Sequence, residues 1–198
     1  MANAKYLISE INQLSEEKCF SVLRRLVNSS LCDPILKRCI KSRPFKDFLH
    51  LRNSIYMLFD GLSFSDTLNV LRSNDVLGAK PKDLTGNALQ EQIRSGLQNL
   101  SGYDSRLLDT LNEAYLAKFS FHFICVTKNL SKNEIMNRFE KRISNDFETE
   151  FLFSIVQLKK LLHLRLLEIV DSHDHPSELS FFMEDLNGYA DQLLNLKS

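Results

Sequence analysis

The chain has 198 residues, 43% of them hydrophobic and 25% charged, which is the composition of a globular protein large enough to bury a core without disulfide or metal support. Basic and acidic residues both number 25, so the formal net charge is zero, and nothing supplies the broad positive field that gathers phosphates in nucleic-acid binding. No apolar run approaches the roughly 18 residues of a membrane span, and the N-terminus becomes polar too early for a signal peptide. We therefore expect a cytoplasmic protein that binds neither nucleic acid nor membranes.

The hydrophobic pattern predicts an all-α fold. Only six glycines and four prolines interrupt the chain, and its apolar residues recur at spacings of three and four, as on one face of a helix. Ser15 and Ser65 are suitable N-caps, and Ser131 forms a capping box with Glu134. We expect a single-domain bundle of about eight or nine helices. The periodic segments are 4–14, 16–27, 33–41, 47–59, 65–72, 87–97, 104–119, 131–142, 146–170 and 177–196.

Two segments lack a helical period. Residues 73–85 contain a glycine and a proline and predict a loop of about a dozen residues, a length that is uncommon in compact domains and is often functional. Residues 119–126 read Phe-Ser-Phe-His-Phe-Ile-Cys-Val, an apolar run that periodicity alone does not assign. We expect this second segment to be extended or irregular.

The C-terminal part is predicted to be an addition to the main helical domain. Residues 1–170 form that domain, and residues 171–198 add a turn and an amphipathic helix packed on it. The broad apolar face of this last helix must be covered by the body of the protein or by another subunit. The final residues Asn195-Leu-Lys-Ser198 differ from the Ser-Lys-Leu type of peroxisomal address.

The sequence predicts neither a metal site nor a cofactor site. His173 and His175 flank Asp174, which supplies at most half of a metal site. No nucleophile elbow, phosphate-binding loop or dinucleotide fingerprint occurs. The four cysteines contain no Cys-x-x-Cys pair and are expected to be reduced core thiols: Cys19, Cys32, Cys39 and Cys125.

Arg165 stands out on the apolar stripe of the longest predicted helix. The other members of the stripe are Phe147, Phe151, Ile155, Leu158, Leu162 and Ile169. A buried guanidinium must meet a carboxylate, backbone carbonyls or a bound anion, because burying an unpaired charge is very costly. An internal ion pair, a snorkelling side chain and an anion site are all compatible with this position.

The helix at 87–97 has two faces. Leu89, Ile93 and Leu97 form the apolar face, and periodicity therefore predicts that Glu91, on the opposite face, is exposed to solvent. That opposite face also carries Ala88, Gln92 and Ser95.

Several ordered motifs between residues 8 and 170 resemble one known family, the 2-oxo-4-hydroxy-4-carboxy-5-ureidoimidazoline (OHCU) decarboxylases. The motifs are Ile11-Asn-x-Leu14-Ser15, Arg43-Pro44-Phe45, Leu84-Thr85-x-x-Ala88-x-x-Glu91-Gln92-x-x-x-Gly96-Leu97, Leu111-Asn112-x-Ala114-Tyr115-x-x-Lys118-Phe119-x-Phe121-x-Phe123-Ile124-Cys125 and Leu164-Arg165-Leu166. The resemblance implies an all-helical, usually homodimeric and cofactor-free enzyme of urate degradation, which converts OHCU into (S)-allantoin and carbon dioxide.

The resemblance also implies roles for individual residues. Glu91 and Gln92 would face the ring of a small anionic ureidoimidazoline or allantoin-like ligand, which reverses the solvent-exposed prediction for Glu91. Arg165 would hold the anion. The backbone of Phe123, Ile124, Cys125, Val126 and Thr127 would line the pocket.

The chain departs from the family pattern at its catalytic pair. Asn74 and Asp75 stand where the family carries a catalytic His-Pro pair, and no histidine lies between His50 and His122 to replace it. Asparagine donates hydrogen bonds but does not titrate near neutral pH, so the proton transfer is expected to slow by roughly 10²–10⁴-fold.

Three smaller departures accompany this loss. Ala88 replaces the family's pocket serine, and the loop from 74 to 88 is about three residues short. In the family's Gly-Phe-Pro-Phe segment, Ser120 takes the place of the glycine and His122 that of the proline. The sequence therefore supports two hypotheses: an impaired decarboxylase, and a non-catalytic family member that binds ureides or another protein.

Overall fold

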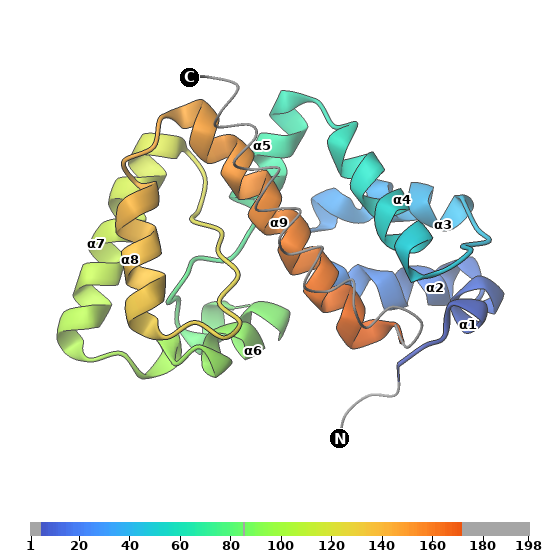
Figure 1. Ribbon diagram of the computed structural model, residues 1–198, viewed down its shortest axis with the longest axis horizontal. Coiled ribbons are helices and arrows are strands. Elements are labelled where there is room, and N and C mark those ends of the chain that lie inside the picture. Colours follow the sequence, from blue (N-terminus) through green and yellow to red (C-terminus); the bar gives the residue numbers. More distant parts are fainter. Residues whose placement is uncertain (1–4, 85, 172–198) are drawn as a thin grey trace. The chain divides into compact units, whose positions relative to one another are not determined.

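The computed structural model describes residues 5–84 and 86–171 (Figure 1). Over these residues it contains nine α-helices and no strand, with one isolated bridge between Tyr6 and Val170, so the predicted all-α class is confirmed. The helices are α1 (Ile8–Gln13), α2 (Glu16–Leu23), α3 (Asp33–Lys41), α4 (Phe48–Asp60), α5 (Phe64–Arg72), α6 (Gly86–Arg94), α7 (Gly102–Phe119), α8 (Lys132–Arg142) and α9 (Phe147–Ile169). The predicted last helix at 177–196 lies outside the described residues.

Some predicted boundaries differ from those observed. The cap of α5 is Ser63 and not Ser65, because the Ser63 hydroxyl accepts a hydrogen bond from the amide of Asp66 at 3.1 Å. The second predicted helix ends as a 3₁₀ turn, Arg24–Leu26, and the loop at 73–85 contains another, Pro81–Asp83. The capping box between Ser131 and Glu134 is confirmed.

The described residues fall into two compact units. The first unit contains residues 5–70 and 159–171, and the second contains the described residues between 71 and 158. Among the described residues, no helix is long and apolar enough to cross a membrane. All four cysteines are buried free thiols, as predicted.

Within the first unit, the motif at residues 11–15 is hydrogen-bonded to the motif at residues 43–45. The side-chain amide of Asn12 donates to the carbonyl of Phe45 and its oxygen accepts from the Phe45 amide, both at 2.8 Å. The guanidinium of Arg43 donates to the carbonyls of Leu14 at 2.6 Å and Ile11 at 3.3 Å. These motifs therefore hold the end of α1 against the turn before α4. Their observed role is structural.

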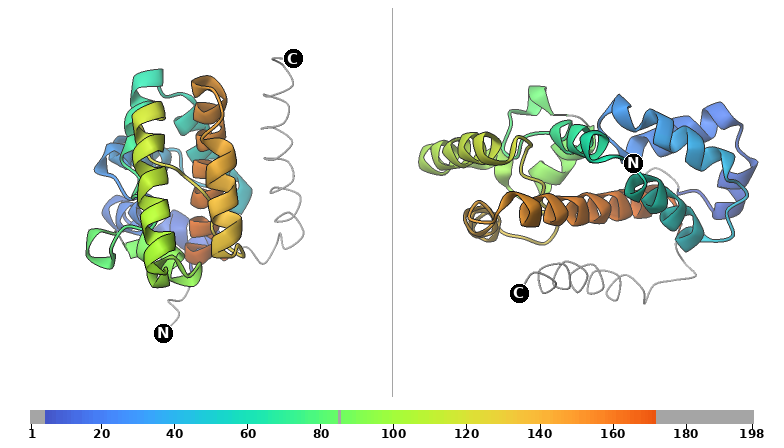
Figure 2. Two further views of the ribbon diagram at one scale, coloured as in Figure 1. Left: turned by 90° about the vertical axis from the view of Figure 1, so that its left-hand side faces the viewer. Right: turned by 90° about the horizontal axis from the view of Figure 1, so that it is seen from above.

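The second unit is built around α7 and α8, which lie side by side in Figures 1 and 2. Between them runs an aromatic cluster in which the ring of Tyr115 lies 5.3 Å from that of Phe123 and 5.4 Å from that of Phe139. The rings of Phe123 and Phe139 stack at 3.9 Å. The segment 120–127, which leaves α7 at the left-handed residue Ser120, is neither helix nor strand, as predicted for 119–126 apart from Phe119, the last residue of α7.

Candidate functional site

Loop 73–79 is fastened to helix α6 by the side chain of Gln92. The Gln92 oxygen accepts from the amide of Gly78 at 2.8 Å, and its nitrogen donates to the carbonyl of Val76 at 3.0 Å. The side chain is buried, with 4% of its surface exposed. Because both ends of the amide bond the loop backbone, Gln92 fixes the loop against α6.

Two more neutral amides hold the same loop. Asn112, on α7, donates to the carbonyl of Leu77 at 2.8 Å, and Gln98 donates to the carbonyl of Ala79 at 3.1 Å. Asn112 belongs to one of the motifs that the sequence singled out, and its observed role is to position this loop.

The segment 120–127 meets both the start of the loop and helix α6. Arg72, the last residue of α5, donates from Nε to the carbonyl of Ser120 at 2.8 Å. At the other end of the segment, the hydroxyl of Thr127 makes a long contact of 3.5 Å with the carbonyl of Glu91. Loop 73–79 is therefore bonded to α6, and segment 120–127 contacts α6 and is bonded to the residue that precedes the loop. We call loop 73–79, α6 and segment 120–127 the three-element cluster.

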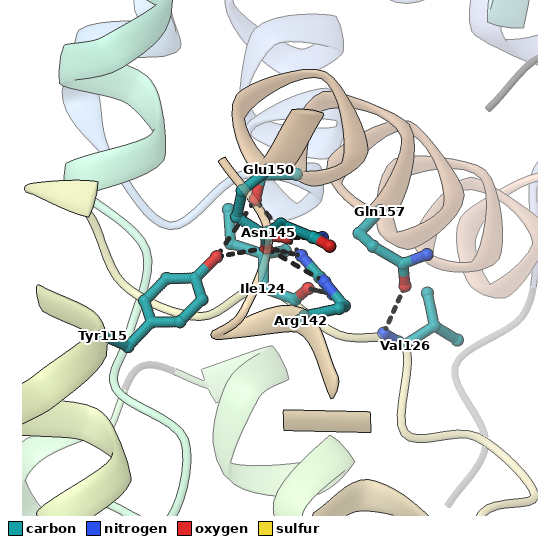
Figure 3. A network of polar contacts seen from close by, with 8 residues as sticks. Tyr115, Ile124, Val126, Arg142, Asn145, Glu150 and Gln157 are labelled. Atoms are coloured by element: carbon teal, nitrogen blue, oxygen red, sulfur yellow. Dashed lines mark hydrogen bonds and ion pairs between the residues drawn. The ribbon is translucent and has the colours of Figure 1, made fainter. Parts of the chain in front are cut away.

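A buried ion pair holds the middle of segment 120–127 (Figure 3). Arg142 donates to the carbonyl of Ile124 at 2.7 Å and also binds a carboxylate oxygen of Glu150 at 2.5 Å. Glu150 is fully buried and Arg142 is 8% exposed. The guanidinium also lies over the ring of Phe123 at 4.5 Å. The charge of Arg142 is thus neutralised, and its remaining donor fixes the backbone of the segment.

Further polar side chains complete this network around Glu150. Tyr115 donates its hydroxyl to one carboxylate oxygen, and Asn145 donates to the other at 2.7 Å. Burial raises the pKa of Tyr115 far above its usual value, so its hydroxyl stays a donor. In Figure 3 the side chain of Gln157, from α9, reaches the same segment, and its oxygen accepts from the amide of Val126 at 3.0 Å.

The structure brings most of the predicted site residues onto the three-element cluster. In the loop, Asn74 and Asp75 are half-buried, and the Asn74 side chain donates to the carbonyl of Leu71 at 3.4 Å. On α6, Ala88 is buried and Glu91 is half-buried. The predicted pocket-lining residues of the segment are all buried: Phe123, Ile124, Cys125, Val126 and Thr127.

The orientation of α6 differs from the periodicity-based prediction. On the predicted apolar face Leu97 is buried and Leu89 half-buried, but Ile93 is 49% exposed, whereas Gln92 and Ser95 on the opposite face are buried. The prediction was therefore wrong for Ile93 and Gln92, because the loop backbone satisfies the amide of Gln92 and removes the cost of burying it. Glu91 is half-buried and so only partly accessible to solvent.

Arg165 lies in the first unit. Its guanidinium is 4% exposed, as its place on the apolar stripe predicts, and it donates to the carbonyl of Leu26 at 3.0 Å and the side-chain oxygen of Asn28 at 3.3 Å. Backbone and amide oxygens are thus among its partners, which was one of the alternatives that the sequence left open.

His122 lies between the buried residues Phe121 and Phe123 and is itself half-buried. Loss of solvent lowers the pKa of His122 below its ordinary value, and the carboxylate of Asp75 acts in the opposite direction with a smaller effect. The imidazole is therefore predominantly neutral at pH 7.

Sequence reasoning missed the buried polar face of α9. Glu150, Ser154 and Gln157 are buried and recur at helical spacings of four and three within an otherwise apolar helix. That spacing was a usable signal for an internal polar network. In the described part of the chain, no group of three or more His, Cys, Asp and Glu side chains is placed to hold a metal ion.

Comparisons with known proteins agree with the motifs. The family model described as OHCU decarboxylase matches residues 12–167. The chain is 26% identical over 175 residues to a 2-oxo-4-hydroxy-4-carboxy-5-ureidoimidazoline decarboxylase of Xenopus laevis, covering 87% of this chain and 99% of the relative.

Two solved structures share the fold. A crystal structure of (S)-allantoin synthase superposes with a TM-score of 0.65 at 18% identity, covering 84% of this chain, which spans 55% of that protein. A crystal structure of OHCU decarboxylase in the presence of (S)-allantoin superposes with a TM-score of 0.61 at 18% identity, covering 78% of this chain and 97% of that one.

Proposed function

Because this chain belongs to the OHCU decarboxylase family, we propose that it acts in urate degradation and converts OHCU into (S)-allantoin and carbon dioxide without a cofactor. The observation that carries this proposal is the three-element cluster, which gathers Asn74, Glu91 and the 123–127 backbone within one compact unit. The names of the relative from Xenopus and of the two solved structures supply the substrate and product classes.

The cluster offers the groups that such a reaction needs. Glu91 is half-buried, and its backbone carbonyl contacts Thr127 of the segment. Its carboxylate is proposed to accept hydrogen bonds from the ureido and ring N–H groups of the ligand. The amide of Asn74 donates a hydrogen bond but transfers no proton near neutral pH. The absence of a titrating group at this one position would by itself slow turnover by roughly 10²-fold or more.

The direct test is the formation of optically active allantoin from freshly generated OHCU, followed by circular dichroism. We expect the wild type to exceed the spontaneous rate and to give the (S) enantiomer. Glu91→Gln should lower the rate by about 10²-fold, because it removes the carboxylate from the cluster. Glu113→Gln, which changes an exposed carboxylate on α7, is the matched control and should leave the rate unchanged.

A wild type that produces allantoin only at the spontaneous rate, with no enantiomeric preference, would contradict the catalytic proposal. The second candidate function is a ureide-binding protein without turnover, and the non-titrating side chain of Asn74 favours it. Calorimetric binding of (S)-allantoin by such an inactive wild type would establish that alternative.

The family resemblance supports two further predictions. Arg165 is proposed to hold the substrate anion, and Arg165→Met should then abolish (S)-allantoin binding. The variant should also lower the melting temperature, because it removes the donor to the carbonyl of Leu26 and to the side chain of Asn28. A homodimer is proposed as the assembly, and sedimentation equilibrium of the full chain would measure its mass.

A further inference from the structure

We infer that His122, assisted by Asp75, is the proton-transfer group of the three-element cluster. This inference rests on the proposed function and names a residue that performs part of it. His122 is the one histidine of the sequence between residues 71 and 158, the range that forms the second unit. It is therefore the side chain of this unit whose ordinary pKa lies nearest to neutral pH.

The backbone places His122 beside the start of loop 73–79. The bond of 2.8 Å from Arg72 to the carbonyl of Ser120 joins the residue just before the loop to the residue two positions before His122. Asp75 is three residues after Arg72 and exerts an electrostatic effect on the imidazole. The residue before the loop is thus bonded to the start of the segment, and Asp75 is near enough to act electrostatically on His122.

His122 is more accessible to solvent than the two phenylalanines beside it. The rings of Phe121 and Phe123 both pack against Tyr115, at 5.9 and 5.3 Å between centroids. Both phenylalanines are buried, whereas His122 between them is half-buried and so remains partly accessible to solvent.

The surroundings of His122 favour the neutral form of its imidazole, which can accept a proton. Partial burial lowers the pKa of His122, and Asp75 limits that decrease. Asp75 in the loop is the charged group that acts on the ring, while Arg72 on α5 is directed to the carbonyl of Ser120. On α6, Glu91 meets the segment at its far end, through Thr127.

The proposed step requires a group that both accepts and donates a proton. In OHCU, the bond between the carboxylate carbon and the ring carbon breaks and CO₂ leaves. The electron pair of that bond stays in the ring, and a ring nitrogen takes a proton from water. The ring hydroxyl then loses a proton and the ureido-bearing carbon gains one, which gives neutral allantoin. Neutral His122 accepts the hydroxyl proton, and the imidazolium, stabilised by Asp75, returns a proton to the carbon.

The first experiment measures the pH dependence of allantoin formation by the full chain. In the wild type the rate should fall as pH decreases through the lowered pKa of His122, because the imidazolium no longer accepts a proton. His122→Gln should lower kcat by about 10²-fold with a KM change of less than about threefold, and should abolish this pH dependence. His50→Gln, which changes a histidine of the first unit, is the matched control.

A second experiment uses no turnover. The imidazole signals of His122 are followed by NMR against pH in the wild type and in Asp75→Asn. We expect a pKa below the ordinary value in the wild type and a further decrease in the variant, because the variant loses the favourable charge.

The outcomes separate this inference from the function on which it rests. A His122→Gln variant that keeps the rate and pH profile of an active wild type would overturn the role of His122 and leave the proposed function standing. An unchanged His122 titration in Asp75→Asn would overturn the pairing with Asp75. A wild type no faster than the spontaneous reaction would overturn both the function and the inference.

Discussion

The two backbone stretches of the three-element cluster are held in different ways. Segment 120–127 is fixed by a buried ion pair, since Arg142 binds both Glu150 and the carbonyl of Ile124. Loop 73–79 is fixed by neutral amides, chiefly that of Gln92. Breaking one partner of a buried ion pair leaves an uncompensated charge, whereas removing a neutral amide leaves only unsatisfied polar groups.

This difference indicates that loop 73–79 tolerates substitutions better than segment 120–127 does. The segment is tied to the folding core through Glu150, so a substitution that shifts its backbone also disturbs the ion pair. The loop is half-buried at Asn74 and Asp75 and depends on weaker bonds. Sequence variation at Asn74 and Asp75 is therefore compatible with an intact fold.

The largest expected effect comes from breaking the charged anchor. Arg142→Met strands the fully buried carboxylate of Glu150 and should lower the free energy of unfolding by about 3–5 kcal/mol, measured by urea denaturation. Lys141→Met, which changes the exposed neighbour, should have almost no effect. The double variant with Glu150→Met should recover much of the loss, and a single variant as stable as the wild type would show that the ion pair is not an anchor.

The next effect concerns the turn of the loop at Gly78. This residue has φ +80°, and an added Cβ would lie 2.3 Å from Cδ2 of Leu108, which is buried. Gly78→Ala should therefore cost about 2–4 kcal/mol, from left-handed strain and overpacking together. Gly96 has φ +75° and open space, so Gly96→Ala is the control and should cost only about 1–2 kcal/mol. Equal losses in the two variants would contradict the close packing at Gly78.

A smaller loss of stability is expected from removing the side-chain amide of Gln92, which holds loop 73–79. Gln92→Met leaves the amide of Gly78 and the carbonyl of Val76 without this partner and should cost about 1–3 kcal/mol. Hydrogen exchange of the Gly78 amide should accelerate far more than that of the Val126 amide. Gln90→Met, on the exposed side of α6, serves as the control. A loss as large as that of Arg142→Met would remove the distinction between the two anchors.

The smallest effect is the pH dependence contributed by His122. Its pKa is lowered in the folded protein, so the unfolded chain binds more protons and stability falls as pH decreases from the ordinary histidine pKa through the lowered value. Denaturation curves between pH 5 and 7 should therefore show a weaker pH dependence in His122→Gln than in the wild type. An identical dependence in both proteins would show that the pKa of His122 is the same in the folded and unfolded chains.

The sequence predicted the helices better than their orientation. Spacings of three and four locate α9, and the failure of any period locates segment 120–127, because both signals are local. The direction in which α6 faces depends on whether Gln92 finds partners, and those partners are backbone groups 14 and 16 residues earlier. Hydrophobicity alone therefore did not predict that Gln92 is buried and Ile93 exposed.

For the candidate site, the sequence pointed to the site residues but not to the ion pair that holds segment 120–127. The family motifs pointed to Asn74, Glu91 and the 123–127 backbone as candidate site residues, and these lie in one compact unit, where α6 is bonded to the loop and contacts Thr127. The anchor of the segment was not predictable, because Glu150 is neutralised by Arg142 and also bonded by Tyr115, 35 residues away. Only the folded chain brings these groups together.

The most direct measurement of the proposed site is an amide NMR titration of the full chain with (S)-allantoin, repeated with (R)-allantoin. We predict that the (S) enantiomer selectively shifts the signals of Asp75, Glu91 and residues 122–127, while those of the exposed end of α7 stay unchanged. Shifts of the same size with both enantiomers, or the absence of shifts on all three elements, would contradict the assignment of the three-element cluster as a ureide-binding site.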